Sequence, residues 1–238
     1  MILVQCKQGD PDWHAARVAV TTASRAKDAC DKLKSGQPSQ KAVAYAAEIA
    51  MESVAGVTCS DVFVNFAMRR GSELEPHARI AYEAATGNLV DESGIYLTDD
   101  RVFGYSSDGA VNDDGLIEIK CPLSALTVIS MWRSGDLSEY VHQIQMGMWL
   151  TGRKWLDFVM FDPRLAPVGK SLFVKRVQRD EAFIEAMESD LMKFVGLVRE
   201  FEGVLRANAG EASPVASIPV PVKTRATAPA ALPTDIFA

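Results

Sequence analysis

Short apolar runs bounded by turn residues characterise the middle and later parts of the chain. Such runs, rich in β-branched and aromatic residues, occur at residues 94 to 97, 102 to 106, 116 to 121, 155 to 161 and 171 to 177. Gly, Asp and Asn separate the first three runs, as is typical of strands joined by tight turns. The pattern therefore predicts five strands.

Apolar residues spaced three or four apart predict the helices. Helices are expected to begin near residues 10 to 13 and to occupy residues 41 to 55, 66 to 85, 138 to 150 and 180 to 206. The last helix has its expected core positions at Phe183, Met187, Leu191, Phe194 and Leu197 or Val198. Residues 21 to 24 are interpreted as the cap of a further helix, and the segment around Trp132 as a polar and aromatic connection. Together these elements predict an α/β or α+β fold with a central mixed β-sheet flanked by helices.

The composition of the chain changes after Arg206. The 238 residues are 48% hydrophobic, which is enough for one good core, so residues 1 to 207 are expected to form one domain. Residues 208 to 238 contain five prolines among Ala, Val, Ser and Thr. Such a segment buries too little apolar surface to offset its ordering entropy, so we expect a disordered tail. Its end, residues 232 to 238, could dock on a partner, but a passive terminus is the simpler expectation.

The charge balance leaves nucleic acid open as a substrate. The chain has 31 acidic and 25 basic residues, a net charge of -6, but an enzyme that moves along DNA needs only a local basic lining. No stretch approaches the length of a membrane span, and the first residues lack a basic leader, so a cytoplasmic location is expected. The cysteines lack a C-x-x-C spacing, which argues against zinc and disulfides and favours small buried hydrophobes. They are Cys6, Cys30, Cys59 and Cys121.

Two carboxylates and an amine are expected to converge in the middle of the chain. Side chains alternate between the faces of a strand, so Glu118 and Lys120 share one face while Ile119 points to the other. The glycine-flanked turn at residues 109 to 115 predicts a tight connection that brings Asp108 back beside Glu118.

This group has a direct chemical use. Two hard oxygen ligands on neighbouring strands suit Mg²⁺ or Mn²⁺, and a water held by such an ion is easier to deprotonate. The lysine can orient or deprotonate that water and offset charge on a phosphoryl group, so a phosphodiester is the natural substrate. The alternative, an edge strand that exposes Glu118 and Lys120 to solvent, is disfavoured by the apolar opposite face. A hard ion does not call for imidazole, so no role is expected for His14, His77 and His142.

Five motifs in order resemble a known family. Asp108 and the following Glu-x-Lys are similar to the PD-(D/E)xK nuclease core. The surrounding sequence resembles that of the phage lambda exonuclease and its YqaJ-type viral recombinase relatives. The resemblance runs from about residue 8 to about residue 205. The segments that carry it are residues 13 to 17 with 22 to 24, 70 to 79, 105 to 109, 116 to 122 and 143 to 149.

The resemblance implies roles for residues far from the central strand. It places Arg17 where an arginine binds a terminal 5′ phosphate, for which a guanidinium fork is well suited, and it adds Ser24 and Ser106 to that phosphate site. It places Glu75 near the metals, although Pro76 biases Glu75 away from a helix interior and makes Glu73 the fallback. Between Gln143 and Gln145, which face different directions on a helix, the resemblance selects Gln143.

The activity implied is that of an alkaline-type phage exodeoxyribonuclease. Such an enzyme would use Mg²⁺, with Mn²⁺ as substitute and two ions in the site, to digest one strand of linear double-stranded DNA from 5′ to 3′. It would leave a 3′ single strand for an annealing protein. Asp108, Glu118 and the Ile119 carbonyl would hold metal, Glu75 would lie near the second ion, and Lys120 would position or activate the water.

The same resemblance implies a homotrimer that encloses DNA, encoded by a phage or prophage and acting in the bacterial cytoplasm. Two alternatives remain. One is a restriction- or repair-type endonuclease on the same core, which would cut closed circles. The other is an idle DNA-binding subunit, against which the intact Asp108, Glu118 and Lys120 argue, because a retired site has no physical need for buried charge.

Overall fold

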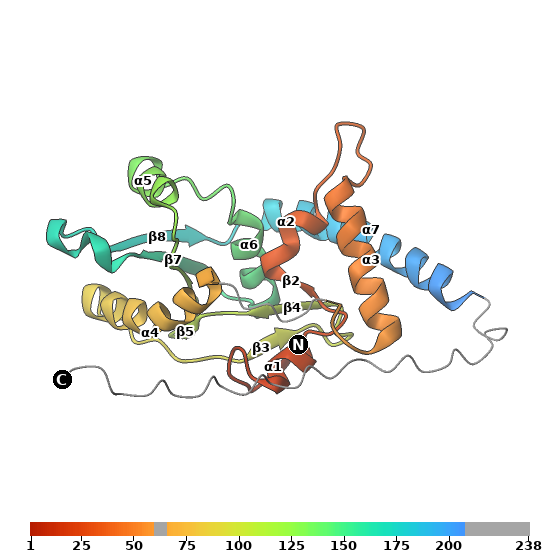
Figure 1. Ribbon diagram of the computed structural model, residues 1–238, viewed down its shortest axis with the longest axis horizontal. Coiled ribbons are helices and arrows are strands. Elements are labelled where there is room, and N and C mark those ends of the chain that lie inside the picture. Colours follow the sequence, from red (N-terminus) through yellow and green to blue (C-terminus); the bar gives the residue numbers. More distant parts are fainter. Residues whose placement is uncertain (60–65, 208–238) are drawn as a thin grey trace, which may run out of the picture. The chain divides into compact units, whose positions relative to one another are not determined.

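The computed structural model describes residues 1–59 and 66–207 (Figure 1). Within these ranges, residues Met1–Ala207 cluster as one unit. The predicted tail at 208 to 238 lies outside the described residues. None of the helices in the described ranges combines the length and the apolar character that crossing a bilayer requires.

The predicted central strand lies inside a four-stranded sheet. The strand order is β5 (Gly109–Val111), β6 (Gly115–Lys120), β7 (Trp155–Phe161) and β8 (Leu172–Gln178). Strand β6 pairs antiparallel with β5 and parallel with β7, which places Glu118 opposite Phe158. Strand β5 pairs only with Gly115–Ile117, so at Glu118 the ladder continues on the β7 side alone. Glu118 is nevertheless buried, at 3% exposed, so the alternative in which it points to solvent is excluded.

A second four-stranded sheet has the order β1 (Ile2–Val4), β3 (Ile95–Leu97), β4 (Phe103–Ser106) and β2 (Thr21–Thr22). Its β2 and β4 are parallel, and its other pairs are antiparallel. Only Ser107 and Asp108 separate β4 from β5, so the chain passes directly from one sheet to the other at Asp108. The predicted α/β class with a mixed sheet and flanking helices is confirmed, with the strands divided between two sheets.

Helices account for most of the remaining described chain, and most were predicted. They are α1 (Pro11–Ala16), η1 (Ala23–Arg25), α2 (Ala26–Ala29), α3 (Gln40–Ala55), α4 (Phe66–Thr86), α5 (Ala125–Ser134), α6 (Val141–Thr151), η2 (Pro163–Val168) and α7 (Glu181–Arg206). One expectation was only partly right and another was wrong. Thr21 and Thr22 form β2, because they pair with Phe103 and Gly104 of β4, and Thr22 is also the N-cap residue of η1, without a side-chain cap hydrogen bond. The segment around Trp132 is helix α5, which Ser124 caps and Gly135 ends in a left-handed conformation.

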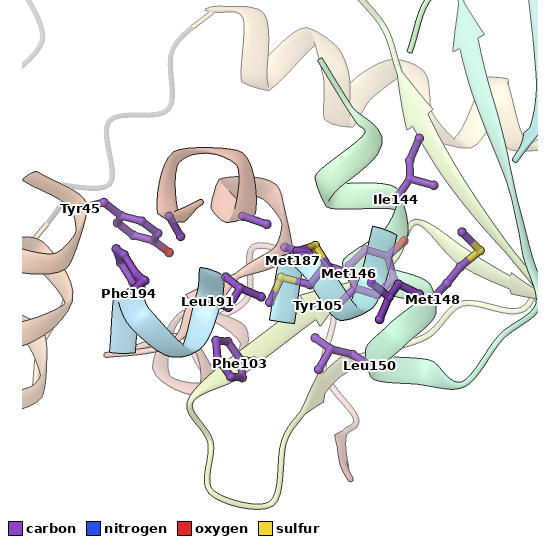
Figure 2. Close-up of a cluster of buried hydrophobic side chains, with 14 of the residues drawn as sticks. Tyr45, Phe103, Tyr105, Ile144, Met146, Met148, Leu150, Met187, Leu191 and Phe194 are labelled. Atoms are coloured by element: carbon purple, nitrogen blue, oxygen red, sulfur yellow. The ribbon is translucent and has the colours of Figure 1, made fainter. Parts of the chain in front are cut away.

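The two faces of β6 pack against different helices. Leu116 belongs to the larger core, which α3, α6 and α7 complete, and Figure 2 shows part of this cluster around Tyr105, Met146 and Leu191. Ile117 and Ile119 belong to a smaller core beneath α4. The predicted alternation of side chains along β6 is therefore confirmed.

The closing helix and the cysteines give a mixed outcome. In α7 the expected core positions Met187, Leu191, Phe194 and Val198 are buried, whereas Phe183 is half-buried. Helices α3 and α7 lie side by side, with the Tyr45 and Phe194 rings 5.2 Å apart (Figure 2).

All four cysteines are free, but the expectation that they are buried was wrong: Cys59 is exposed and the others are half-buried.

Candidate active site

One cavity of about 320 Å³ gathers every residue that the sequence proposed for the site. Its walls come from α1 and the loop after it, η1, α4, β4, β6 and α6. The proposed residues that line it are Arg17, Ser24, Glu75, Ser106, Asp108, Glu118, Ile119, Lys120 and Gln143. Arg17 and Gln143, which are 126 positions apart in the sequence, therefore line the same cavity.

Glu118 is the centre of the site. Its side chain is 3% exposed, and Oε1 accepts hydrogen bonds from Lys120 Nζ at 2.6 Å and from Gln143 Nε2 at 2.5 Å. Oε2 accepts one from the Tyr105 hydroxyl at 3.3 Å. Three neighbours from three elements thus fix the orientation of this carboxylate, as a preorganised site requires.

Lys120 remains charged in this environment. Burial alone would lower the pKa of its ammonium group, but the attraction of Glu118 and Asp108 and the hydrogen bond to Glu118 raise it above the ordinary value. The side chain also lies 5.8 Å from the Tyr140 ring centroid. A cation held at the cavity wall can orient a water molecule and stabilise charge on a phosphoryl group.

Asp108 occupies the short link between the two sheets. Its Oδ2 accepts a 2.6 Å hydrogen bond from the backbone N–H of Ile119, which ties the link to β6. Burial, and then the negative charges of Glu118 and Glu75, raise the pKa of the Asp108 carboxyl well above its usual range. Mutual repulsion of this kind is relieved when a cation binds between the carboxylates.

The donor set suits a hard divalent cation. In the described part of the chain, no three His, Cys, Asp or Glu side chains form a complete metal-binding group by themselves. Mg²⁺ does not need one, since it keeps several waters and is usually held by one or two carboxylates and substrate phosphates. Asp108 and Glu118 supply two buried carboxylates. The Ile119 carbonyl leaves β6 on the same side as its N–H, which faces Asp108.

Glu75 reaches the same cavity from α4. The expected interruption at Pro76 was wrong: α4 continues through the proline, which removes only one intrahelical hydrogen bond from a long helix. Burial and the charge of Glu118 raise the Glu75 pKa, and Arg79, whose Nη2 lies 3.1 Å from Glu75 Oε1, partly offsets this. The fallback Glu73 is exposed and does not line the cavity.

The same cavity also holds the proposed phosphate-binding residues. The Arg17 guanidinium lies 4.2 Å from the Trp13 ring centroid, and Trp13 Nε1 donates to Ser106 Oγ at 3.0 Å. Ser24 Oγ lies 3.2 Å from Thr22 Oγ1. Burial lowers the pKa of Arg17, although Tyr45 and Glu52 act in the opposite direction. No carboxylate among residues 1–59 and 66–207 forms an ion pair with Arg17, so its fork remains available for an anion.

Gln145 and the three histidines lie outside the cavity, as expected. Gln145 faces away from the site, where its amide donates to the Gln178 carbonyl and accepts from the Asp180 N–H. None of the three histidines lines the cavity. His142, for example, packs edge-on against Phe183, and burial lowers its pKa.

Three supporting side chains were missed by the sequence reasoning. Tyr105 and Trp13 lay inside recognised motifs, but nothing local indicated that their polar atoms would reach Glu118 and Ser106. Glu52 is buried in α3, where it accepts hydrogen bonds from the N–H groups of Ala19 and Cys59. It thereby holds the turn after Arg17, in which Ala19 has a φ of 58°.

Comparisons with known proteins show which family the chain resembles. The YqaJ-like viral recombinase domain matches residues 12–154. A crystal structure of the alkaline exonuclease LHK-Exo from Laribacter hongkongensis is 40% identical, with a TM-score of 0.73, and covers 85% of this chain and 100% of its own. A complex of LHK-Exo with dAMP gives the same identity and coverage and a TM-score of 0.74.

A more distant structure supports the fold alone. A phage related exonuclease from Haemophilus somnus 129PT is 17% identical over 78% of this chain and 94% of its own, with a TM-score of 0.58. No curated protein matched. The family model matches more than half of the chain, and the chain is 40% identical to LHK-Exo. The chain therefore belongs to the YqaJ-like viral recombinase family.

Proposed function

We propose that this protein is a Mg²⁺-dependent exonuclease that degrades one strand of linear double-stranded DNA from its 5′ end and leaves a 3′ overhang. The family supports the exonuclease role. The observation that carries the finer proposal is the single cavity lined by two chemically different groups of residues. One group, carboxylates and a lysine, suits phosphodiester hydrolysis, and the other, an arginine with two serines, suits a terminal phosphate.

The size of the cavity agrees with removal of one nucleotide at a time. At about 320 Å³ it is at the small end of ligand pockets, which span roughly 300–1,000 Å³. A strand whose 5′ phosphate sits at Arg17, Ser24 and Ser106 would present its next phosphodiester toward Glu118 and Lys120. Cleavage of the bond between phosphorus and the 3′ oxygen leaves a new 5′ phosphate on the shortened strand. That phosphate can bind at Arg17 in the next cycle.

The residues of the cavity would have different roles in hydrolysis. Asp108, Glu118 and the Ile119 carbonyl would hold Mg²⁺, or Mn²⁺ as substitute, and Glu75 would assist a second ion. When bound, the metal lowers the pKa of a water and polarises the phosphoryl group. Gln143 and Tyr105 orient Glu118 through its two carboxylate oxygens. Lys120 positions the attacking water and stabilises the charge that develops on the phosphoryl oxygens.

A comparison of three substrates tests this function. We expect linear duplex with a 5′ phosphate to be digested fastest, linear duplex with a 5′ hydroxyl more slowly, and closed circular duplex not at all. Omission of Mg²⁺ should stop every reaction. Cutting of the circle would replace the proposal with the restriction- or repair-type endonuclease, and binding of DNA without any hydrolysis would favour the idle subunit.

Arg17→Ala is expected to remove most of the preference for phosphorylated ends. The loss should be about 1.5–3 kcal/mol in relative kcat/KM, the range for a hydrogen bond to a charged group. Digestion rates of the two linear duplexes, measured for each variant, give this preference directly. Lys27→Ala is the control, because Lys27 pairs with exposed Glu139 outside the cavity. An unchanged preference in Arg17→Ala would mean that another residue binds the end.

We also propose that the enzyme is a homotrimer enclosing DNA and that a single-strand annealing protein contacts its folded domain in the bacterial cytoplasm. Deletion of residues 208 to 238 should leave digestion unchanged and preserve most of the partner binding, because residues Met1–Ala207 contain the whole site and cluster as one unit. Sedimentation gives the oligomeric state. Pull-down of the annealing protein with the truncated chain gives the partner surface, and complete loss of capture would move that surface to the deleted segment.

A further inference from the structure

Arg79 connects Glu75 and Asp108, two acidic residues of the site that come from different elements. Its side chain is 17% exposed and extends from α4. Nη2 donates to Glu75 Oε1 at 3.1 Å and to the backbone carbonyl of Asp108 at 3.0 Å. Nη1 donates to Glu92 Oε1 at 2.7 Å. One guanidinium nitrogen therefore joins a carboxylate on α4 to the main chain that carries the neighbouring carboxylate.

The main chain at Asp108 lies outside the strand pairing on both sides. The paired part of β4 ends at Ser106, which is opposite Ile95, and that of β5 begins at Gly109, opposite Ile117. Asp108 is thus in the crossing between two sheets, where a side chain takes over the hydrogen bonding that a ladder supplies elsewhere. Arg79 supplies it from α4, and the Ile119 N–H supplies a second bond to the Asp108 side chain from β6.

Arg79 contacts this pair from outside the active-site cavity. Glu75 and Asp108 line both the active-site cavity and a second hollow of about 640 Å³. Arg79 and Glu92 line only the second hollow. The guanidinium is therefore placed to hold the acidic residues and not to contact a phosphate beside Lys120.

We propose that Arg79 is a positioning residue for the divalent metal site. Its Nη2 holds the Glu75 side chain and the Asp108 main chain at a fixed separation, so that both carboxylates face the cavity before an ion arrives. This inference rests on the proposed metal-dependent function. Groups that orient metal ligands in this way typically change metal affinity or activity about 10–100-fold when they are removed.

If Arg79 acted only through its charge, its removal would change metal affinity in the opposite direction. A cation beside acidic ligands repels a metal ion, so loss of Arg79 without loss of geometry should strengthen metal binding. Arg79→Lys separates the two effects, because lysine retains the charge but its side chain is one bond shorter, so its nitrogen falls short of the Nη2 position that contacts both acceptors. Arg79→Met removes both the charge and the donors while it retains an unbranched apolar stem.

Calorimetric titration of the full chain with Mn²⁺ alone, without DNA, tests the proposal. We expect Arg79→Lys and Arg79→Met each to weaken Mn²⁺ binding about 10–100-fold. The matched control is Glu92→Gln, which removes the exposed partner of Arg79 but leaves its contacts to Glu75 and Asp108, and it should change affinity less than about 3-fold.

The other outcomes are distinct. An unchanged dissociation constant in both variants, with a lower melting temperature or a smaller binding fraction, would assign Arg79 to stability only and overturn the proposal. Tighter binding in Arg79→Met with no change in Arg79→Lys would overturn it in favour of the charge effect. Failure of the unmodified chain to bind Mn²⁺ would overturn the proposed metal-dependent function itself. If Arg79→Met does not fold, the comparison of Arg79→Lys with Glu92→Gln still decides the matter.

Discussion

Glu118→Gln and Lys120→Met are expected to abolish digestion for different reasons. Glutamine retains the shape of Glu118 but removes the negative charge that the proposed metal requires, so Mn²⁺ binding should weaken. Methionine retains the stem of Lys120 but removes the ammonium that orients water and stabilises the phosphoryl group, which contributes about 10²–10⁴-fold to rate in comparable sites. Because Lys120 lies 2.6 Å from Glu118, its loss removes a positive charge beside the metal site, and Mn²⁺ binding should be retained or strengthened.

Single-turnover digestion of a phosphorylated linear duplex and calorimetric titration with Mn²⁺ measure the two effects separately. An exposed ion pair near the other end of β6, between Asp114 and Lys154 at 3.0 Å, supplies matched controls. Asp114→Asn and Lys154→Met make the same chemical changes outside the cavity and should leave rate and affinity unchanged. Equal loss of Mn²⁺ binding in Glu118→Gln and Lys120→Met would contradict this division of roles.

The local part of the site was predictable because a strand has a period of two. That period alone placed Glu118 and Lys120 on one face and Ile119 on the other, whatever the rest of the fold. The meeting of Arg17 and Gln143 with this pair depends on where the end of α1 and helix α6 lie against the sheets. Only the resemblance to a family indicated it, and the cavity brings these residues together. Their functional roles remain predictions.

The supporting hydrogen bonds could not be read from the sequence. Whether a tyrosine hydroxyl or an arginine fork reaches an acidic residue depends on distances between elements far apart in the chain. Tyr105 and Glu118 are joined across β4 and β6, which belong to different sheets, and Arg79 and Asp108 across α4 and the crossing between sheets. Neither pair has a spacing that a helix or strand would produce.

The elements that were missed are short or carry a weak pattern. Strands β1 and β5 have three residues each, too few to show alternation. Helix α5 buries Val128 and Met131 but leaves Leu126 and Ile129 exposed, so its apolar residues do not mark a single face. By contrast, α3 and α7 bury residues at regular helical spacing, and both were predicted with nearly correct bounds.

Tyr105→Ala is expected to have the largest effect on stability. Tyr105 is 1% exposed and lies in the larger core (Figure 2). It packs directly on Gly147, where an added Cβ would lie 2.7 Å from the ring. Truncation of a buried aromatic ring costs about 3–5 kcal/mol, a large part of the roughly 5–15 kcal/mol that stabilises a domain. Removal of the ring would leave an empty space next to Glu118, so the variant should also lose activity.

Tyr105→Phe separates packing from hydrogen bonding at this position. It retains the ring and removes only the hydroxyl, whose bond to Glu118 is long at 3.3 Å, so the free energy of unfolding should fall by only about 1 kcal/mol. Urea unfolding with a chelator present measures stability without a contribution from bound metal. The half-buried Tyr96 lies directly opposite on β3 and provides the matched control. If Tyr96→Ala were as destabilising as Tyr105→Ala, burial of the Tyr105 ring would not explain the loss.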